Sequence, residues 1–160
     1  MNIYLIRHAE AEKLNPGLKD RQRALTQQGI EELKSSLILM HNYVSKIDII
    51  FTSPYLRAVQ TAEIIAESFK VKEKTVADKS VSPGFDSESL IELTAGYTFK
   101  EAAFVGHQPD IGDILSELIS DCYPNFEIKP STIIKIAFDR NPVKGKGILK
   151  FIFPPPVKNG

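Results

Sequence analysis

Short, mostly apolar runs alternate along this chain with longer stretches in which apolar residues recur every three or four positions. The short runs are rich in Ile, Val and Phe and are bounded by polar or turn residues, which is typical of strands. Five of them predict strands: residues 3–6, 47–51, 102–105, 132–138 and 148–153. We expect the last two to form a hairpin through residues 141–147, and residues 71–81 to hold one further short strand.

Two of the longer stretches predict the first pair of helices. Thr26 is a good N-cap for the first helix. The positions after it form one apolar stripe: Ile30, Leu33, Leu37, Met40 and Val44. The second helix follows residues 52–54, with Pro54 in its first turn. The side chains that we expect it to direct inward are Ala58, Ala62, Ile65 and Phe69.

A second pair of helices completes the pattern. The third is capped by Asp86 or Ser87 and extends to about Ala95, and the fourth covers about residues 110–119. Strands that alternate with helices favour an α/β fold with helices on both faces of the sheet. We therefore expect a three-layer α/β/α sandwich with a mostly parallel central sheet, built as a single domain over residues 1–160.

The composition argues against nucleic-acid binding, a membrane span and a signal peptide. Hydrophobic residues make up 42% of the 160 positions, and 20 basic residues balance 20 acidic ones. This balance offers no basic surface for nucleic acid, and no apolar stretch reaches the length of a membrane span. The N-terminal residues also lack the basic start of a signal peptide. Since Cys122 is the only cysteine, we expect a cytoplasmic protein in which this side chain is at least half-buried.

Residues that can handle phosphate follow three of the expected strands. Arg7 and His8 come at the end of the first strand, Ser53 after the second and His107 after the third. Arg57 lies one helical turn beyond Ser53. Ligands of open α/β sheets bind beyond the carboxyl ends of the parallel strands, so we expect these side chains to share one pocket.

Such a set of side chains suits phosphoryl transfer without a metal or another cofactor. A neutral imidazole is a good nucleophile near neutral pH, and an arginine stays charged and forks onto phosphate oxygens. His8 is the candidate nucleophile. Arg7, Arg57 and His107 would form a cationic cage around the phosphoryl oxygens.

Three motifs resemble those of the histidine phosphatase superfamily, which includes the phosphoglycerate mutases. They are LIRHAEA at residues 5–11, SPYLRAVQTA at residues 53–62 and VGHQP at residues 105–109. The resemblance extends to about residue 118. It implies a phosphoglycerate mutase-like fold and catalysis through a phosphohistidine formed on His8.

Two further stretches narrow the resemblance to one branch of the superfamily. RALTQQG at residues 23–29 and VSPGFD at residues 81–86 are similar to the SixA-type phosphohistidine phosphatases. The catalytic set that this branch implies is His8, Arg7, Arg57 and His107. Arg23 and Ser53 would add phosphate contacts, although Arg23 could equally belong to a solvated charged loop. The implied partner is a phosphotransfer protein that carries phosphohistidine, with inorganic phosphate as the product.

One part of the wider family pattern is missing. Mutase-like members carry a Glu or Asp that protonates the leaving oxygen, and residues 76–86 hold no clear equivalent. Asp86 is the best remaining candidate for a general acid. A phosphohistidine substrate needs such an acid less, because imidazole is a better leaving group than an alcohol. Two alternatives stay open: a small-molecule phosphomonoesterase that uses Asp86, and a phosphate-binding module with little turnover.

Overall fold

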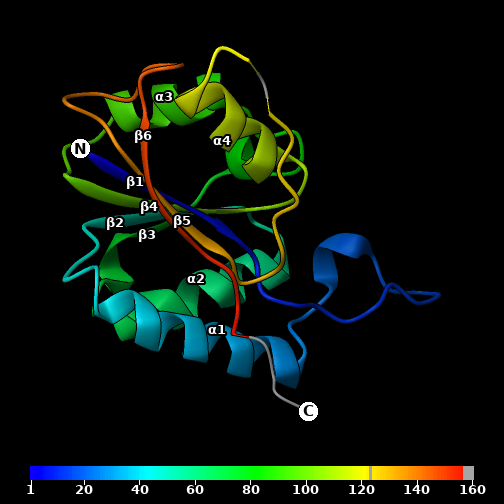
Figure 1. Ribbon diagram of the computed structural model, residues 1–160. Helices are drawn as coiled ribbons and strands as arrows, with labels where there is room; N and C mark the ends of the chain where they lie inside the picture. Colours follow the sequence, from blue (N-terminus) through cyan, green and yellow to red (C-terminus); the bar gives the residue numbers. More distant parts are fainter. Residues whose placement is uncertain (123, 157–160) are drawn as a thin grey trace.

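The computed structural model describes residues 1–122 and 124–156, which form a six-stranded sheet between two pairs of helices (Figure 1). The strands are β1 (Asn2–Arg7), β2 (Ile49–Thr52), β3 (Thr75–Ala77), β4 (Glu101–Gly106), β5 (Ile133–Ala137) and β6 (Ile148–Phe153). The helices are α1 (Gln27–His41), α2 (Leu56–Ser68), α3 (Ser87–Ala95) and α4 (Asp110–Ile119). Short 3-10 helices are η1 (Asp20–Gln22), η2 (Lys72–Lys74) and η3 (Lys79–Val81). Within the described ranges, no helix is long and apolar enough to cross a membrane.

The strand order is β3-β2-β4-β1-β5-β6. The pairs β3–β2, β2–β4 and β4–β1 are parallel, whereas β5 runs antiparallel to both of its neighbours. The α/β/α sandwich with a mostly parallel sheet is therefore confirmed. The expected hairpin of the last two strands is also present.

The two faces of the sheet hold separate apolar cores. On β1, Ile3 and Leu5 face the core beneath α3 and α4, and Tyr4 and Ile6 face the core that α1 and α2 cover. All four side chains are fully buried. Successive strand residues point to opposite faces, so a strand covered on both sides needs a continuous apolar run. This explains the unbroken run at residues 3–6.

The helix starts follow the sequence signals with one exception. Thr26 caps α1, where its Oγ1 accepts the N–H of Gly29 at 3.0 Å, and Asp86 caps α3 through the N–H of Ser89. Pro54, however, does not lie in the first turn of α2, because Tyr55 is the N-cap. The residues before the helix instead form a turn in which Ser53 Oγ accepts the N–H of Tyr55 at 3.3 Å.

Three side chains differ from their expected positions. Val44 lies beyond the end of α1 but is buried in the same core, and Phe69 is the C-cap of α2 and only half-buried. Cys122, which we expected to be at least half-buried, is exposed in the turn after α4. A single small side chain outside any periodic stretch carries no signal for burial, which is why that expectation was wrong.

Candidate active site

The site lies where β2, β4 and β1 end side by side. The parallel register pairs Arg7 with Gly106 and Thr52 with Val105, which brings the residues after each strand to one edge of the sheet. Backbone hydrogen bonds continue this alignment past the strand ends. The N–H of His8 donates to Gly106 O at 3.0 Å, and that of Ser53 donates to Val105 O at 3.1 Å.

Hydrogen bonds at both ring nitrogens hold the His8 side chain in one orientation. Nδ1 lies 2.7 Å from the carbonyl oxygen of Ala9, which can only accept, so Nδ1 carries the proton. Nε2 then has the free electron pair, and the Nε–H of Arg57 donates to it at 3.1 Å. Only 8% of the His8 surface is exposed. The buried ring therefore presents an unprotonated nitrogen to a guanidinium group.

Arg57 connects the parts of the site. Besides its bond to His8, its Nη1 donates to the backbone oxygen of Asp20 at 2.8 Å, and its Nη2 forms an ion pair with Asp20 Oδ2 at 3.0 Å. Nη2 also lies 3.5 Å from Nδ1 of His107. The Tyr55 ring lies under the guanidinium, 5.0 Å from Cζ. Contacts at all three guanidinium nitrogens therefore hold the Arg57 side chain in place.

His107 lies beside His8, with 5.1 Å between the ring centroids. Its Nε2 is 2.8 Å from Oγ of the fully buried Ser53. Because an Arg57 N–H points toward Nδ1, that nitrogen is best left unprotonated, and Nε2–H then donates to Ser53. The Tyr55 ring closes the far side, 5.2 Å from the His107 ring.

Both histidines are poor bases in this setting. Burial lowers the pKa of His8 to about 4, and the positive charges of Arg57, Arg7 and Arg23 add to the effect. Burial also lowers the pKa of His107 to about 3, helped by His8 and Arg57. Both rings are therefore uncharged near neutral pH, which leaves the electron pair on His8 Nε2 available for attack.

The other two expected phosphate ligands lie around this centre. Arg7 donates through Nη1 to the backbone oxygen of Ile128, while its buried Nε has no hydrogen-bond partner among the described residues. Arg23 donates through Nε to the backbone oxygen of Glu12 at 2.6 Å and pairs with Asp20 at 2.8 Å. Arg23 therefore reaches the site through Asp20, by which it is linked to Arg57.

Asp86 does not join the site. It is exposed at the N-cap of α3, and the hydrogen bond from the N–H of Ser89 lowers its pKa. A carboxyl group that caps a helix and holds its charge is a poor proton donor. The placement of Asp86 therefore gives no support to its expected role as a general acid, and its helix-capping role explains why it occurs at this position.

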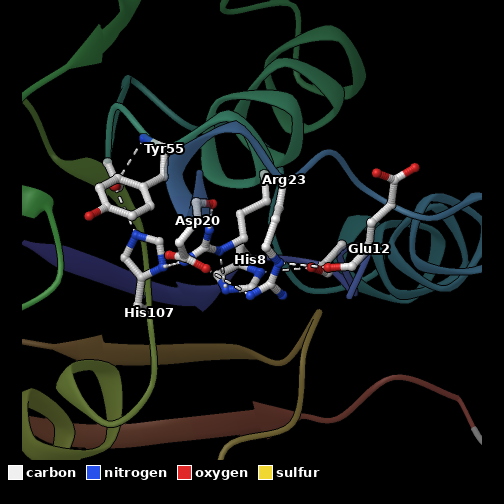
Figure 2. A network of polar contacts seen from close by, with 9 residues as sticks. His8, Glu12, Asp20, Arg23, Tyr55 and His107 are labelled. Atoms are coloured by element: carbon white, nitrogen blue, oxygen red, sulfur yellow. Dashed lines mark hydrogen bonds and ion pairs between the residues drawn. The ribbon is translucent and has the colours of Figure 1, made fainter. Parts of the chain in front are cut away.

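The carboxylate that does reach the site is one that the sequence analysis did not single out. Asp20 lies between His107 and Arg23 in Figure 2 and forms ion pairs with both Arg57 and Arg23. Burial raises its pKa, but the hydrogen bonds from the two arginines outweigh burial and leave the pKa below its usual value. The spacing of three residues between Asp20 and Arg23 was the sequence signal that could have indicated their ion pair.

The described residues contain no group of three or more His, Cys, Asp or Glu side chains that could hold a metal ion. The charged groups at the site are instead three arginines and one aspartate. The formal net charge of the chain is zero, so this is a local concentration of positive charge at the ends of three strands. Such a concentration suits an anionic ligand with several oxygen atoms.

The family model of the histidine phosphatase superfamily (branch 1) matches residues 3–79, a range that includes His8, Ser53 and Arg57. His107, which directly follows β4, lies beyond that range. The chain is therefore similar to the histidine phosphatase superfamily in the sequence of residues 3–79 and in its fold.

SixA-type proteins are among the proteins to which the chain is similar. The chain is 28% identical over 151 residues to a phosphohistidine phosphatase SixA homolog of Haemophilus influenzae, covering 88% of this chain and 90% of that protein. The structure of the protein histidine phosphatase SixA complexed with tungstate matches with a TM-score of 0.79 at 23% identity, covering 97% of each chain. The alpha-ribazole phosphatase of Shigella flexneri matches with a TM-score of 0.72 at 16% identity, covering 99% of this chain and 100% of that one.

Proposed function

We propose that this protein is a metal-independent phosphatase that hydrolyses protein phosphohistidine through a phosphorylated His8. The observation that carries the proposal is the orientation of His8, whose unprotonated Nε2 faces Arg57 while its Nδ1–H is bound to Ala9 O. The similarity to SixA-type proteins supports the same conclusion. In this mechanism, Nε2 attacks phosphorus in line with the bond that breaks.

The first step exchanges one P–N bond for another. As the bond from phosphorus to His8 Nε2 forms, the bond to the substrate imidazole breaks, and that ring keeps the electron pair and the proton on its other nitrogen. Arg57, Arg7 and His107 stabilise the three equatorial oxygens, and Arg23 adds a further positive charge. Water then attacks phosphorus, which returns the electron pair to His8 Nε2 and releases inorganic phosphate.

The leaving group fits the state of two candidate acids, Asp20 at the site and Asp86 outside it. The pKa values of Asp20 and Asp86 are both lowered, so neither is a ready proton donor near neutral pH. An alcohol leaves poorly without a proton, whereas a phosphohistidine ring protonated on its second nitrogen leaves as a neutral imidazole. A site without a ready acid therefore favours a phosphoramidate over a phosphate ester.

Trapping of the phosphorylated enzyme tests the nucleophile. Protein mixed with a radiolabelled phosphohistidine peptide should retain label when the reaction is stopped in alkali, in which P–N bonds survive. The variant His8→Ala should retain none and lose at least 10³-fold in kcat/KM. The matched control is His41→Ala, because His41 is exposed and bonds only to Ser68 within the described structure. Equal labelling of wild type and His8→Ala would refute the mechanism.

A second candidate substrate class is a small phosphate ester. Structural similarity to an alpha-ribazole phosphatase favours it. Asp110, whose pKa is raised by burial and whose carboxylate accepts the N–H of Gly84, is tested beside Asp86 as the acid that an ester would need. Hydrolysis of a phosphohistidine peptide and of p-nitrophenyl phosphate should be compared in wild type, Asp110→Asn and Asp86→Asn. We expect kcat/KM to favour the peptide and to survive both substitutions. A preference for the ester that Asp110→Asn or Asp86→Asn abolishes would assign the second class.

The proposed substrate defines the partner and the location. A phosphohistidine on another protein identifies a phosphotransfer protein as the partner, and we place both in the cytoplasm, because the single free Cys122 suits a reducing compartment. If no phosphorylated enzyme forms while inorganic phosphate still binds tightly, the protein is a phosphate-binding module instead.

A further inference from the structure

Asp20 occupies the groups that the proposed function assigns to phosphate. Its Oδ2 is 3.0 Å from Arg57 Nη2 and its Oδ1 is 2.8 Å from Arg23 Nη1. Its backbone oxygen takes the remaining outer nitrogen of Arg57 at 2.8 Å. One residue therefore engages two arginines through three oxygen atoms. A phosphoryl group would present the same number of oxygens to the same donors.

Asp20 and a phosphoryl group compete for the same edge of Arg57. One N–H of each outer nitrogen already donates to Asp20, and the Nε–H donates to His8. A phosphoryl dianion placed against Arg57 would also face the negative charge of Asp20 in a partly buried setting, where like charges repel more than they do in water. Binding of phosphate therefore requires Asp20 to move away.

The loop that carries Asp20 is built so that such a movement is local. Its base is closed by the bridge between Ala11 and Leu25 and by the bond from the N–H of Glu12 to Ala24 O at 2.9 Å. Beyond this base, residues 12–17 are exposed, and η1 has no buried residue. Figure 1 shows the loop extending away from the sheet and the helices. The contacts of Asp20 and Arg23 hold the second half of the loop, which leads back to α1, against the body of the protein.

We propose that Asp20 is an internal competitor of the phosphoryl group: it occupies Arg57 and Arg23 in the unliganded protein and is displaced, together with the loop of residues 12–24, when phosphate binds. The proposal rests on the proposed function, since it takes Arg57 as a phosphate ligand. In the unliganded state, Asp20 keeps the two guanidinium groups close to the positions in which phosphate needs them. In exchange, every phosphate that binds must first break two ion pairs.

Binding of inorganic phosphate to the variant Asp20→Asn tests the competition. The amide keeps the size of the side chain but removes its charge, so we expect phosphate to bind about three- to tenfold more tightly than to wild type, as two partly exposed ion pairs would predict. Isothermal titration measures the affinity. Asp139→Asn is the matched control, because Asp139 is exposed and its side chain has no hydrogen bond or ion pair in the described structure, and its affinity for phosphate should equal that of wild type. Unchanged or weaker binding to Asp20→Asn would overturn the proposal.

Loop displacement has a readout of its own. Lys19 and Arg21 flank Asp20, whose ion pairs hold this segment to the body of the protein, so release of the loop by saturating phosphate should speed trypsin cleavage after them in wild type. In Asp20→Asn, cleavage should already be fast without phosphate. Protection of these sites by phosphate would show that the loop closes over the ligand and would contradict displacement.

The variant Arg57→Ala separates this proposal from the proposed function. If phosphate binds to it as to wild type, Arg57 is not a phosphate ligand and the proposed site is wrong. If Arg57→Ala loses binding while Asp20→Asn fails to gain it, the site stands and the internal competitor alone is refuted.

Discussion

At the scale of single residues, the site depends on keeping two neighbouring imidazoles uncharged. His8 and His107 are almost fully buried beside Arg57, and their rings are 5.1 Å apart. A proton on either ring would place a further positive charge beside Arg57 in a buried setting. Burial and, after it, the neighbouring charges lower the pKa values of His8 and His107 to about 4 and about 3. Burial first and the neighbouring cations second keep His8 uncharged, as the proposed nucleophile must be.

The titration of these rings is directly observable. Protonation removes the electron pair of His8 Nε2, so attack should be lost only as the pH falls through about 4, well below the ordinary histidine value of about 6.5. NMR titration of the ring signals of the unliganded protein should give two apparent pKa values near 4 and 3, which belong to the coupled pair. The variants His8→Asn and His107→Asn assign the signals. A titration of His8 near 6.5 would contradict the burial described here.

Addition of phosphate should move the same titrations in the opposite direction. A dianion in contact with His107 favours the charged ring, so the pKa of His107 rises when phosphate binds and the protein takes up a proton. Inorganic phosphate is itself mostly protonated at pH 6, so the probe is sulfate, which stays a dianion, and titration calorimetry at pH 6 in two buffers of different ionisation enthalpy measures this uptake. We expect uptake of part of a proton per sulfate in wild type and less in His107→Asn. Proton release by wild type would be incompatible with this arrangement.

At the scale of elements, much could be predicted from local pattern. Thr26 and Asp86 were recognisable as caps because a helix start needs a side-chain acceptor there. The strand ends could be placed because apolar runs stop at Arg7 and Gly106. The ion pairs of Asp20 could not be predicted, because they depend on where a loop returns in space. Sequence alone left Arg23 undecided for the same reason.

One glycine fixes the base of this loop against α1. A Cβ added at Gly29 would lie 2.4 Å from the backbone oxygen of Glu10, which accepts the N–H of Thr26. Gly29→Ala should therefore lower the free energy of unfolding by about 1–3 kcal/mol, as measured by urea denaturation. Gly96→Ala is the control, because its Cβ would meet Leu93 O at an ordinary 3.6 Å and should cost almost nothing. Equal stability of both variants would show that the loop base yields easily.

At the scale of the whole molecule, one sheet carries two cores and the site. β4 lies between β1 and β2, and it contributes Phe104 to one core and Val105 to the other before it ends at Gly106. Displacement of either core would shift the strand end that leads to His107. The integrity of the site should therefore follow the folding of the entire sheet.

This coupling makes the single domain expected from the sequence testable. Urea unfolding followed by far-ultraviolet circular dichroism and by tyrosine fluorescence should give one coincident transition, because Tyr4 lies in one core and Tyr97 packs on Phe51 in the other. Phosphate at 100 times its Kd should raise the free energy of unfolding by about 2.7 kcal/mol by both probes. Arg57→Ala should not respond to phosphate. Two separate transitions would divide the chain into independent units.

The narrow base of loop 12–24 has a consequence for the engineering of this protein. The chain leaves and rejoins the body of the protein at the Ala11–Leu25 bridge, so the segment between these residues can be exchanged as a unit. Foreign sequences of different length could be grafted between residues 13 and 18 without a change in the backbone that holds His8. Libraries built at this position would sample new target proteins while the same chemical centre is retained.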